Sequence, residues 1–190
     1  ITSIGKFAFA QCRSLKSVVI GNNVTNIGYN AFSEYTITSI TYTGDMKSWC
    51  QINGLLYLMP CWQNDRKLFI DGKEITGELT IPDNLTIIGD WSFEGCRSLT
   101  KVIIPDGVTD IGWYAFAECS SLKSVVIPDS VTNIGSWLFA ECRKLTDINY
   151  CGTKAQWEAM EKGDTWNYNT NGFTVHCTDG NIEVKLNFAI

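Results

Sequence analysis

The sequence is poor in charge, and the charge that it has is spread thinly. Only 18% of the 190 residues are Asp, Glu, Lys or Arg, and the formal net charge is −5. A protein that binds nucleic acid needs a basic face to neutralise phosphates, and none is encoded here. The basic residues stand singly, so no polybasic segment is available to hold an anionic membrane. We therefore expect no nucleic-acid partner.

Long apolar runs are also missing. The longest purely apolar stretches are a few residues, far short of the roughly 20 that a transmembrane helix needs, so we expect no direct membrane insertion. The first residues, ITSIGKFAFAQC, lack the basic start and the apolar core of a signal peptide. They also begin partway through a repeat, so the chain is expected to come from a longer one, and the missing signal decides nothing about export.

Motifs for catalysis and for cofactors are absent from the sequence. It has no GxSxG, no phosphate-binding loop, no GxGxxG and no CxxC pair, and its acidic residues are too dispersed to predict paired carboxylates. The only histidine, His176, precedes Cys177, and neighbouring residues on a strand point to opposite faces, which argues against a nucleophile–base pair. We expect no enzyme activity, no cofactor and no metal.

The sequence does contain an internal repeat. An Ile-Gly pair recurs along the chain in steps of 23, 61, 23 and 23, and a phenylalanine stands five positions after each isoleucine. The isoleucines are Ile4, Ile27, Ile88, Ile111 and Ile134, and the phenylalanines are Phe9, Phe32, Phe93, Phe116 and Phe139. Columns of leucine, cysteine and proline keep the same spacing. The unit reads LxxVxIPxxVTxIGxxAFxxCxx.

The apolar spacing changes along this unit. LxxVxI and VTxI are rich in β-branched residues and suit short strands, whereas apolar residues three apart after the glycine suit one or two turns of helix. Glycine and proline stand at the changeovers, where the chain must bend. One unit cannot bury its apolar residues, but stacked units can. The expected fold is an α/β, β-rich leucine-rich-repeat solenoid, a right-handed coil with short parallel strands on one face and short helical turns on the other.

A longer period encloses the short one. Trp49, which follows a Tyr-x-Gly motif, recurs as Trp157 after a second such motif, and Asp71-Gly72 recurs as Asp179-Gly180 at the same offset. The segments that contain these motifs depart from the short pattern. We expect a single solenoid over 1–190, with repeats at 1–40, an irregular insert at 41–75, repeats at 76–149 and a C-terminal capping module at 150–190.

The repeat carries a family resemblance. IPxxVTxIGxxAFxxCxxLxxV resembles the BspA-like, treponemal-type leucine-rich repeat of bacterial surface proteins. The terminal segments YCGTKAQWEAM and FTVHCTDGNIEV are similar to end modules of such proteins from anaerobic gut bacteria. The resemblance implies an extracellular or cell-surface protein that binds host proteins or other cells, and it carries over no catalytic residue.

Two surfaces are candidates for binding a partner. In LxxVxI the repeated spacing predicts that Leu, Val and Ile point inward and that the positions between them point outward, although β-branched residues there also simply favour strands. The candidate residues on this strand face are Val19, Thr41, Lys101, Ile103, Lys123, Val126 and Asn149. A second surface is aromatic, and stacking between repeats is its favoured explanation over a binding hot spot. Its residues are Phe7, Tyr29, Trp91, Trp113, Tyr114 and Trp137.

The eight cysteines form two sets. One set shares a repeat column that should be buried, where a free thiol behaves as a small apolar residue. Its members are Cys12, Cys96, Cys119 and Cys142. In the other set, Cys50–Cys61 or Cys151–Cys177 could form disulfides in an exported protein, although neither pair has a counterpart in the other copy of the longer period.

The favoured function is a cell-surface or secreted module for protein interaction or adhesion, without catalytic activity. Its partner is expected to be an extracellular protein or glycan, and the sequence leaves its oligomeric state open. The alternative is a structural spacer stalk that displays another domain of a longer surface protein.

Overall fold

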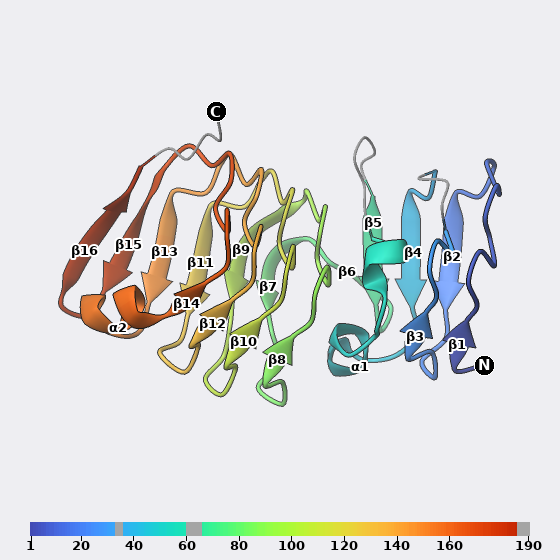
Figure 1. Cartoon of the computed structure of the whole chain (residues 1–190), viewed down its shortest axis with the longest axis horizontal. Helices are drawn as coiled ribbons and strands as arrows, with labels where there is room; N and C mark the ends of the chain where they lie inside the picture. The colour runs from blue at the N-terminus through green and yellow to red at the C-terminus, as the bar shows by residue number, and fades with distance from the viewer. Residues whose placement is uncertain (33–35, 60–65, 186–190) are drawn as a thin grey trace.

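The protein, seen in a computed structural model that describes residues 1–32, 36–59 and 66–185, is a β-rich solenoid. Its coils stack along the long axis, and each coil adds a strand to a ladder on one side and a turn on the other (Figure 1). A single apolar core runs through the stack. The predicted solenoid is therefore confirmed.

The LxxVxI segments form the main strand ladder, which is divided into two sheets. Neighbouring strands are parallel except in the hairpins β5–β6 and β15–β16. The first sheet contains β2 (Ser17–Ile20), β4 (Ser39–Tyr42), β5 (Lys67–Ile70) and β6 (Lys73–Glu74). The second contains β7 (Gly77–Thr80), β9 (Leu99–Ile103), β11 (Ser124–Ile127), β13 (Asp147–Tyr150), β15 (Phe173–Cys177) and β16 (Gly180–Val184).

A second ladder of two-residue strands lies at the Ile-Gly marker. It contains β1 (Ser3–Ile4) and β3 (Asn26–Ile27), then β8 (Ile87–Ile88), β10 (Asp110–Ile111), β12 (Asn133–Ile134) and β14 (Glu161–Lys162). The glycine of the marker is needed for close packing between coils. A Cβ atom on Gly28 would lie 2.7 Å from the Lys6 nitrogen, and one on Gly135 would lie 2.6 Å from the Gly112 carbonyl carbon.

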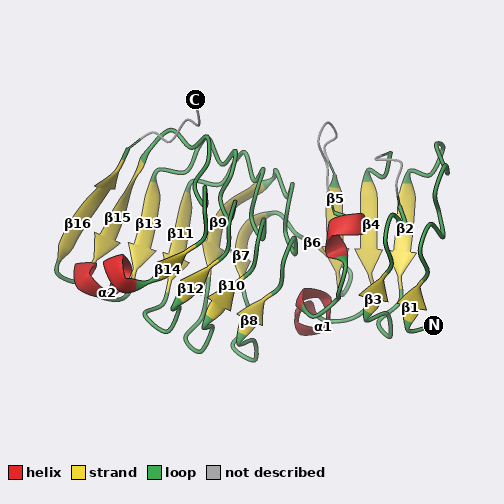
Figure 2. Ribbon diagram, in the orientation of Figure 1, coloured by secondary structure: helices red, strands yellow, loops and turns green. Residues whose placement is uncertain are grey.

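The stretch after each Ile-Gly differs from the expected helical turns. Among the described residues the only α-helices are α1 (Met46–Cys50) and α2 (Lys154–Ala159), with one 3-10 turn, η1 (Leu55–Tyr57), after α1 (Figure 2). In the repeats this stretch forms tight turns with a positive φ, 63° at Trp91, which interrupts a right-handed helix. The Trp91 N–H donates to the Trp113 carbonyl of the next coil (2.8 Å) instead of to its own turn.

The phenylalanine and cysteine columns fill the interior. Phe93, Phe116 and Phe139 are fully buried and stack with ring centroids 5.3 and 6.2 Å apart. The thiols of the next column are buried as predicted at Cys96, Cys119 and Cys142. The prediction is wrong for Cys12, which is exposed.

The insert and the C-terminal segment are built alike. Asp45 caps α1 by accepting a hydrogen bond from the Ser48 N–H (2.8 Å), and Thr153 caps α2 in the same way through the Gln156 N–H (3.3 Å). Each helix is followed by one more parallel strand and by a hairpin that ends a sheet. The insert therefore contributes a ladder strand of its own, β5.

Of the two possible disulfides, one is absent and the other includes a residue outside the described part of the chain. Cys151 and Cys177 are not bridged. The pairing of Asn149 with His176 places Cys177 beside Tyr150, so the Cys151 side chain lies on the other side of the ladder. The Cys50–Cys61 pair cannot be followed, since Cys61 lies outside the described residues. Cys50 itself is buried, and this burial raises the pKa of its thiol to about 12.

Candidate binding surfaces

The seven candidate residues that were predicted on the outward side of the strands do point outward, but they do not form one patch. Ile103, Val126 and Asn149 lie side by side on β9, β11 and β13 of the second sheet. Lys101 projects from β9, and Lys123 immediately precedes β11. The other two candidates, Val19 and Thr41, are paired on β2 and β4 of the first sheet, beyond the break between β6 and β7.

Burial alternates along these strands as the period of a strand requires. Val102, Val125 and Ile148 are fully buried, whereas the residues that follow them face outward. Val19 is 71% exposed, which is high for a valine. We call the outward surface of the second sheet the strand face. Its two columns are Thr80, Ile103, Val126, Asn149 and His176, and Glu78, Lys101, Ser124, Asp147 and Thr174.

Cross-strand polar pairs hold several side chains of the strand face in place. The Lys101 ammonium lies 3.1 Å from the Glu78 carboxylate, and His176 Nε2 lies 2.8 Å from Asp147 Oδ1. The bond to Asp147 raises the pKa of His176, and bonds from His176 and Thr146 lower the pKa of Asp147.

The sequence-based prediction missed two outward residues in these columns. His176 extends the Asn149 column into the cap, and Phe69 on β5 lies beside Thr41 in the first sheet. Both belong to strands that the short repeat pattern does not mark. The alternation in KLFI and FTVHC was the available signal, because each segment reads as a strand that continues the ladder.

The aromatic residues form stacks between coils, as predicted. Trp91 and Tyr114 stack with centroids 4.1 Å apart and planes 13° apart, and Tyr114 stacks on Trp137 at 5.7 Å and 3°. Tyr168 of the C-terminal segment closes this ladder at 4.8 Å from Trp137. Trp113 points outward from the ladder and is 60% exposed.

A groove runs beside this ladder on the turn side of the second run of coils. It has a volume of about 560 Å³, and the small side chains Ala117 and Ala140 lie between the aromatic rings and a row of charged residues. The Arg97 guanidinium donates to the Glu118 carboxylate across this row (2.8 Å). Arg143 likewise pairs with Glu141, so both arginines of this row are neutralised within the protein, which weakens the case for an anionic ligand here.

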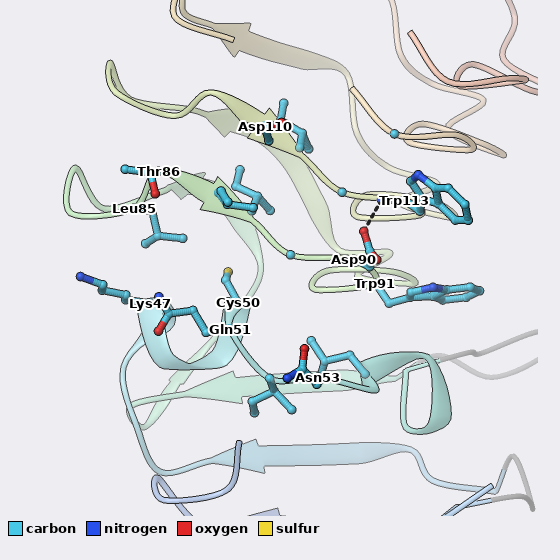
Figure 3. Close-up of a pocket in the computed structure, with 18 of the residues that line it drawn as sticks. Lys47, Cys50, Gln51, Asn53, Leu85, Thr86, Asp90, Trp91, Asp110 and Trp113 are labelled. Carbon is cyan, nitrogen blue, oxygen red and sulfur yellow. Dashed lines mark hydrogen bonds between the residues drawn. The ribbon is translucent and has the colours of Figure 1, made fainter. Parts of the chain in front are cut away.

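A second groove of about 710 Å³ lies where the insert meets the second run of coils (Figure 3). We call it the junction groove. One wall is the α1–η1 segment, with Lys47, Gln51 and Asn53, and the other consists of the coils that contain β8 and β10. The side chains of the second wall include Asn84, Thr86, Asp90, Trp91, Asp110 and Trp113.

The two walls of the junction groove are joined at its base by close packing. The buried Trp49 indole N–H donates to the Ser92 carbonyl (2.8 Å), and a Cβ atom on Gly89 would lie 2.1 Å from the Cys50 carbonyl oxygen. The two runs of coils are therefore in direct contact at the base of the groove.

Neither a cluster of metal-ligating side chains nor a membrane-spanning helix is found in the described part of the chain. No group of three or more His, Cys, Asp or Glu side chains within it could hold a metal ion. Likewise, none of its helices has the length and apolar character to span a bilayer.

Six copies of the BspA type leucine rich repeat match the sequence, over residues 1–51 and 66–161. The chain belongs to the BspA-type leucine-rich-repeat family. Two segments are unmatched: 52–65 lies within the insert and 162–190 within the C-terminal segment, and the short repeat pattern is lost in both. No curated protein matches the chain.

Several solved structures are similar to this BspA-type chain. A leucine-rich repeat protein from Eubacterium ventriosum is 20% identical with a TM-score of 0.46, covering 80% of this chain and 58% of that one. A leucine rich cell surface protein from Faecalibacterium prausnitzii is 20% identical with a TM-score of 0.35, covering 84% and 66%. The pneumococcal vaccine antigen PcpA is 14% identical with a TM-score of 0.47, covering 94% and 60%. The chain thus spans less than two thirds of each.

Proposed function

We propose that this chain is a non-catalytic interaction module, extracellular or on the cell surface, that binds a protein partner through the strand face. The family is typical of bacterial surface proteins, which supports the location. The observation that carries the proposal is the row of Ile103, Val126 and Asn149, which are aligned on three parallel strands. The ion pair between Lys101 and Glu78 borders this row.

The chemistry of the strand face suits a protein better than a small ligand. Ile103 and Val126 lie about 4.8 Å apart on neighbouring strands and form a short apolar strip, which Thr80 and Asn149 continue on either side. The Lys101–Glu78 and His176–Asp147 pairs border this strip. An apolar centre with a polar rim is the usual anatomy of a protein interface, and side chains that are already held lose less entropy on binding.

Surface plasmon resonance against purified extracellular-matrix and mucosal proteins tests this function. We expect Val126→Glu to weaken binding at least tenfold, because it places a charge in the centre of the apolar strip. Ile87→Glu is the control and should retain binding, since Ile87 is an exposed β-branched residue on β8 of the other ladder, outside the strand face. Binding that is unaffected by Val126→Glu, or no binding to any protein of the panel, would refute the proposal.

A spacer stalk is the second candidate function. The observation in its favour is the repetition of the helix–strand–hairpin module at α1–β6 and at α2–β16, since such modules add length in tandem. A stalk would tolerate Val126→Glu without loss of any partner. The same binding experiment therefore separates the two functions.

A further inference from the structure

The junction groove is a gap in two ladders at once. Asn53 bridges to Asn26 of β3, and β8 pairs with β10, but within the described residues no strand pairing joins Asn53 to β8. The aromatic stacks are interrupted at the same place. Tyr57 packs on Tyr29 in one stack, and Trp91 packs on Tyr114 in the other. Asn53, β8 and Trp91 thus border an open space.

Trp91 is half-buried and lines this gap. Tyr114, which packs on one face of the Trp91 ring at 4.1 Å, comes from the following coil, and within the described residues no aromatic ring stacks on the opposite face, toward the α1–η1 segment. Figure 3 shows Trp91 at the border of the groove, below Trp113. The face of an aromatic ring carries partial negative charge and attracts the weakly positive C–H groups of an apolar ring face.

Polar side chains that have no side-chain hydrogen bond within the described residues line the groove together with Trp91. Gln51 and Asn53 on one wall, and Asn84 and Thr86 on the other, form no side-chain hydrogen bond within the described residues. Asp90 Oδ1 accepts a bond from the Trp113 N–H (2.8 Å), which leaves Oδ2 for a ligand. Amides both donate and accept hydrogen bonds, as sugar hydroxyls do.

We propose that the junction groove binds a neutral oligosaccharide, with one sugar ring stacked on Trp91 and its hydroxyls bonded to the surrounding amides. A volume of about 710 Å³ is within the usual range for small-ligand sites, about 300–1,000 Å³. The charges of Lys47 and Asp90 are of opposite sign, and no arginine lines the groove to select an anion. Besides its apolar side chains, the groove is lined by seven residues that carry an amide, a hydroxyl or a carboxylate, which suits the many hydroxyls of a sugar.

This binding is separate from the strand-face function. The first measurement is a printed array of neutral oligosaccharides built from hexose and N-acetylhexosamine units, followed by titration calorimetry with the strongest binder. We expect Trp91→Ala to raise Kd at least tenfold. Trp137→Ala is the matched control, because Trp137 stands in the same column but has Tyr114 and Tyr168 as ring neighbours and does not line the groove.

The polar wall is tested without disturbing the aromatic stack. Asn84→Ala together with Gln51→Ala should raise Kd about tenfold or more, whereas Asn23→Ala, at the same repeat position as Asn84, should leave it unchanged. The double variant and its Asn23→Ala control test the proposed sugar site if Trp91→Ala fails to fold. The proposal is overturned if no oligosaccharide binds, or if binding survives the double substitution. Val126→Glu should retain sugar binding, so a failure here is distinct from a failure of the strand face.

Discussion

The single histidine of the chain forms an exposed cross-strand pair with Asp147 at the end of the strand face. His176 also contacts Asn181, and Glu183 faces it from β16. Because folding raises the pKa of His176, the pair stabilises the fold at pH values below the ordinary histidine pKa of about 6.5. This contribution is lost as the pH rises through the raised pKa. The lowered pKa of Asp147 contributes above the ordinary aspartate value and is lost as the pH falls through the lowered one.

The pair should therefore stabilise the protein in mildly acidic solution. We expect Asp147→Asn to lower Tm by about 1–2 °C at pH 5, since exposed pairs contribute little, and to lower it less at pH 9, where His176 is neutral and the bond from Thr146 remains. Asp110→Asn is the control, because Asp110 accepts a bond from the preceding Thr109 as Asp147 does from Thr146, but it has no histidine partner. Equal losses at both pH values, measured by thermal melts, would contradict this assignment.

At the scale of the element, the glycine of the Ile-Gly marker controls how closely one coil approaches the next. We expect Gly89→Ala to destabilise the protein by about 1–3 kcal/mol, because the new methyl group would overlap the Cys50 carbonyl at the end of α1. Gly5→Ala, at the same repeat position, meets no atom within 4 Å and should be neutral. Urea denaturation measures both values. A Gly89→Ala protein as stable as Gly5→Ala would mean that α1 shifts freely.

The short period was sufficient to predict the solenoid and the direction of the strand-face side chains, because a column of identical spacing must stack on itself. It was insufficient for the turns, since apolar residues three apart also suit a turn that bonds to the next coil, as Trp91 does. The junction groove could not be predicted either. Gln51 and Asn84 are distant in the sequence and adjacent only because the insert interrupts both ladders.

At the scale of the whole molecule, the coupling between the two runs of coils depends on the junction. The strand ladders are not continuous across it, so within the described residues the contact is made by core packing, by the bond from the Trp49 indole to the Ser92 carbonyl, and by hydrogen bonds of Cys50 with Ser92 and Gly89. In a solenoid, stability is nearly a sum of units and of interfaces between neighbours. Weakening one interface should therefore divide the molecule into two folding units.

Trp49→Phe tests this coupling directly. It leaves a buried carbonyl at the junction without its donor, which costs about 1–3 kcal/mol in addition to the cost of the smaller ring in the core. We expect the variant to melt in two steps, with a calorimetric enthalpy larger than the van't Hoff value, and amides of β2–β5 to exchange faster than those of β9–β13. Trp157→Phe is the matched control, at the corresponding position of the C-terminal module, where the indole N–H has no hydrogen bond within the described residues. It should lower Tm without splitting the transition, and equal behaviour of the two variants would show that the core alone couples the halves.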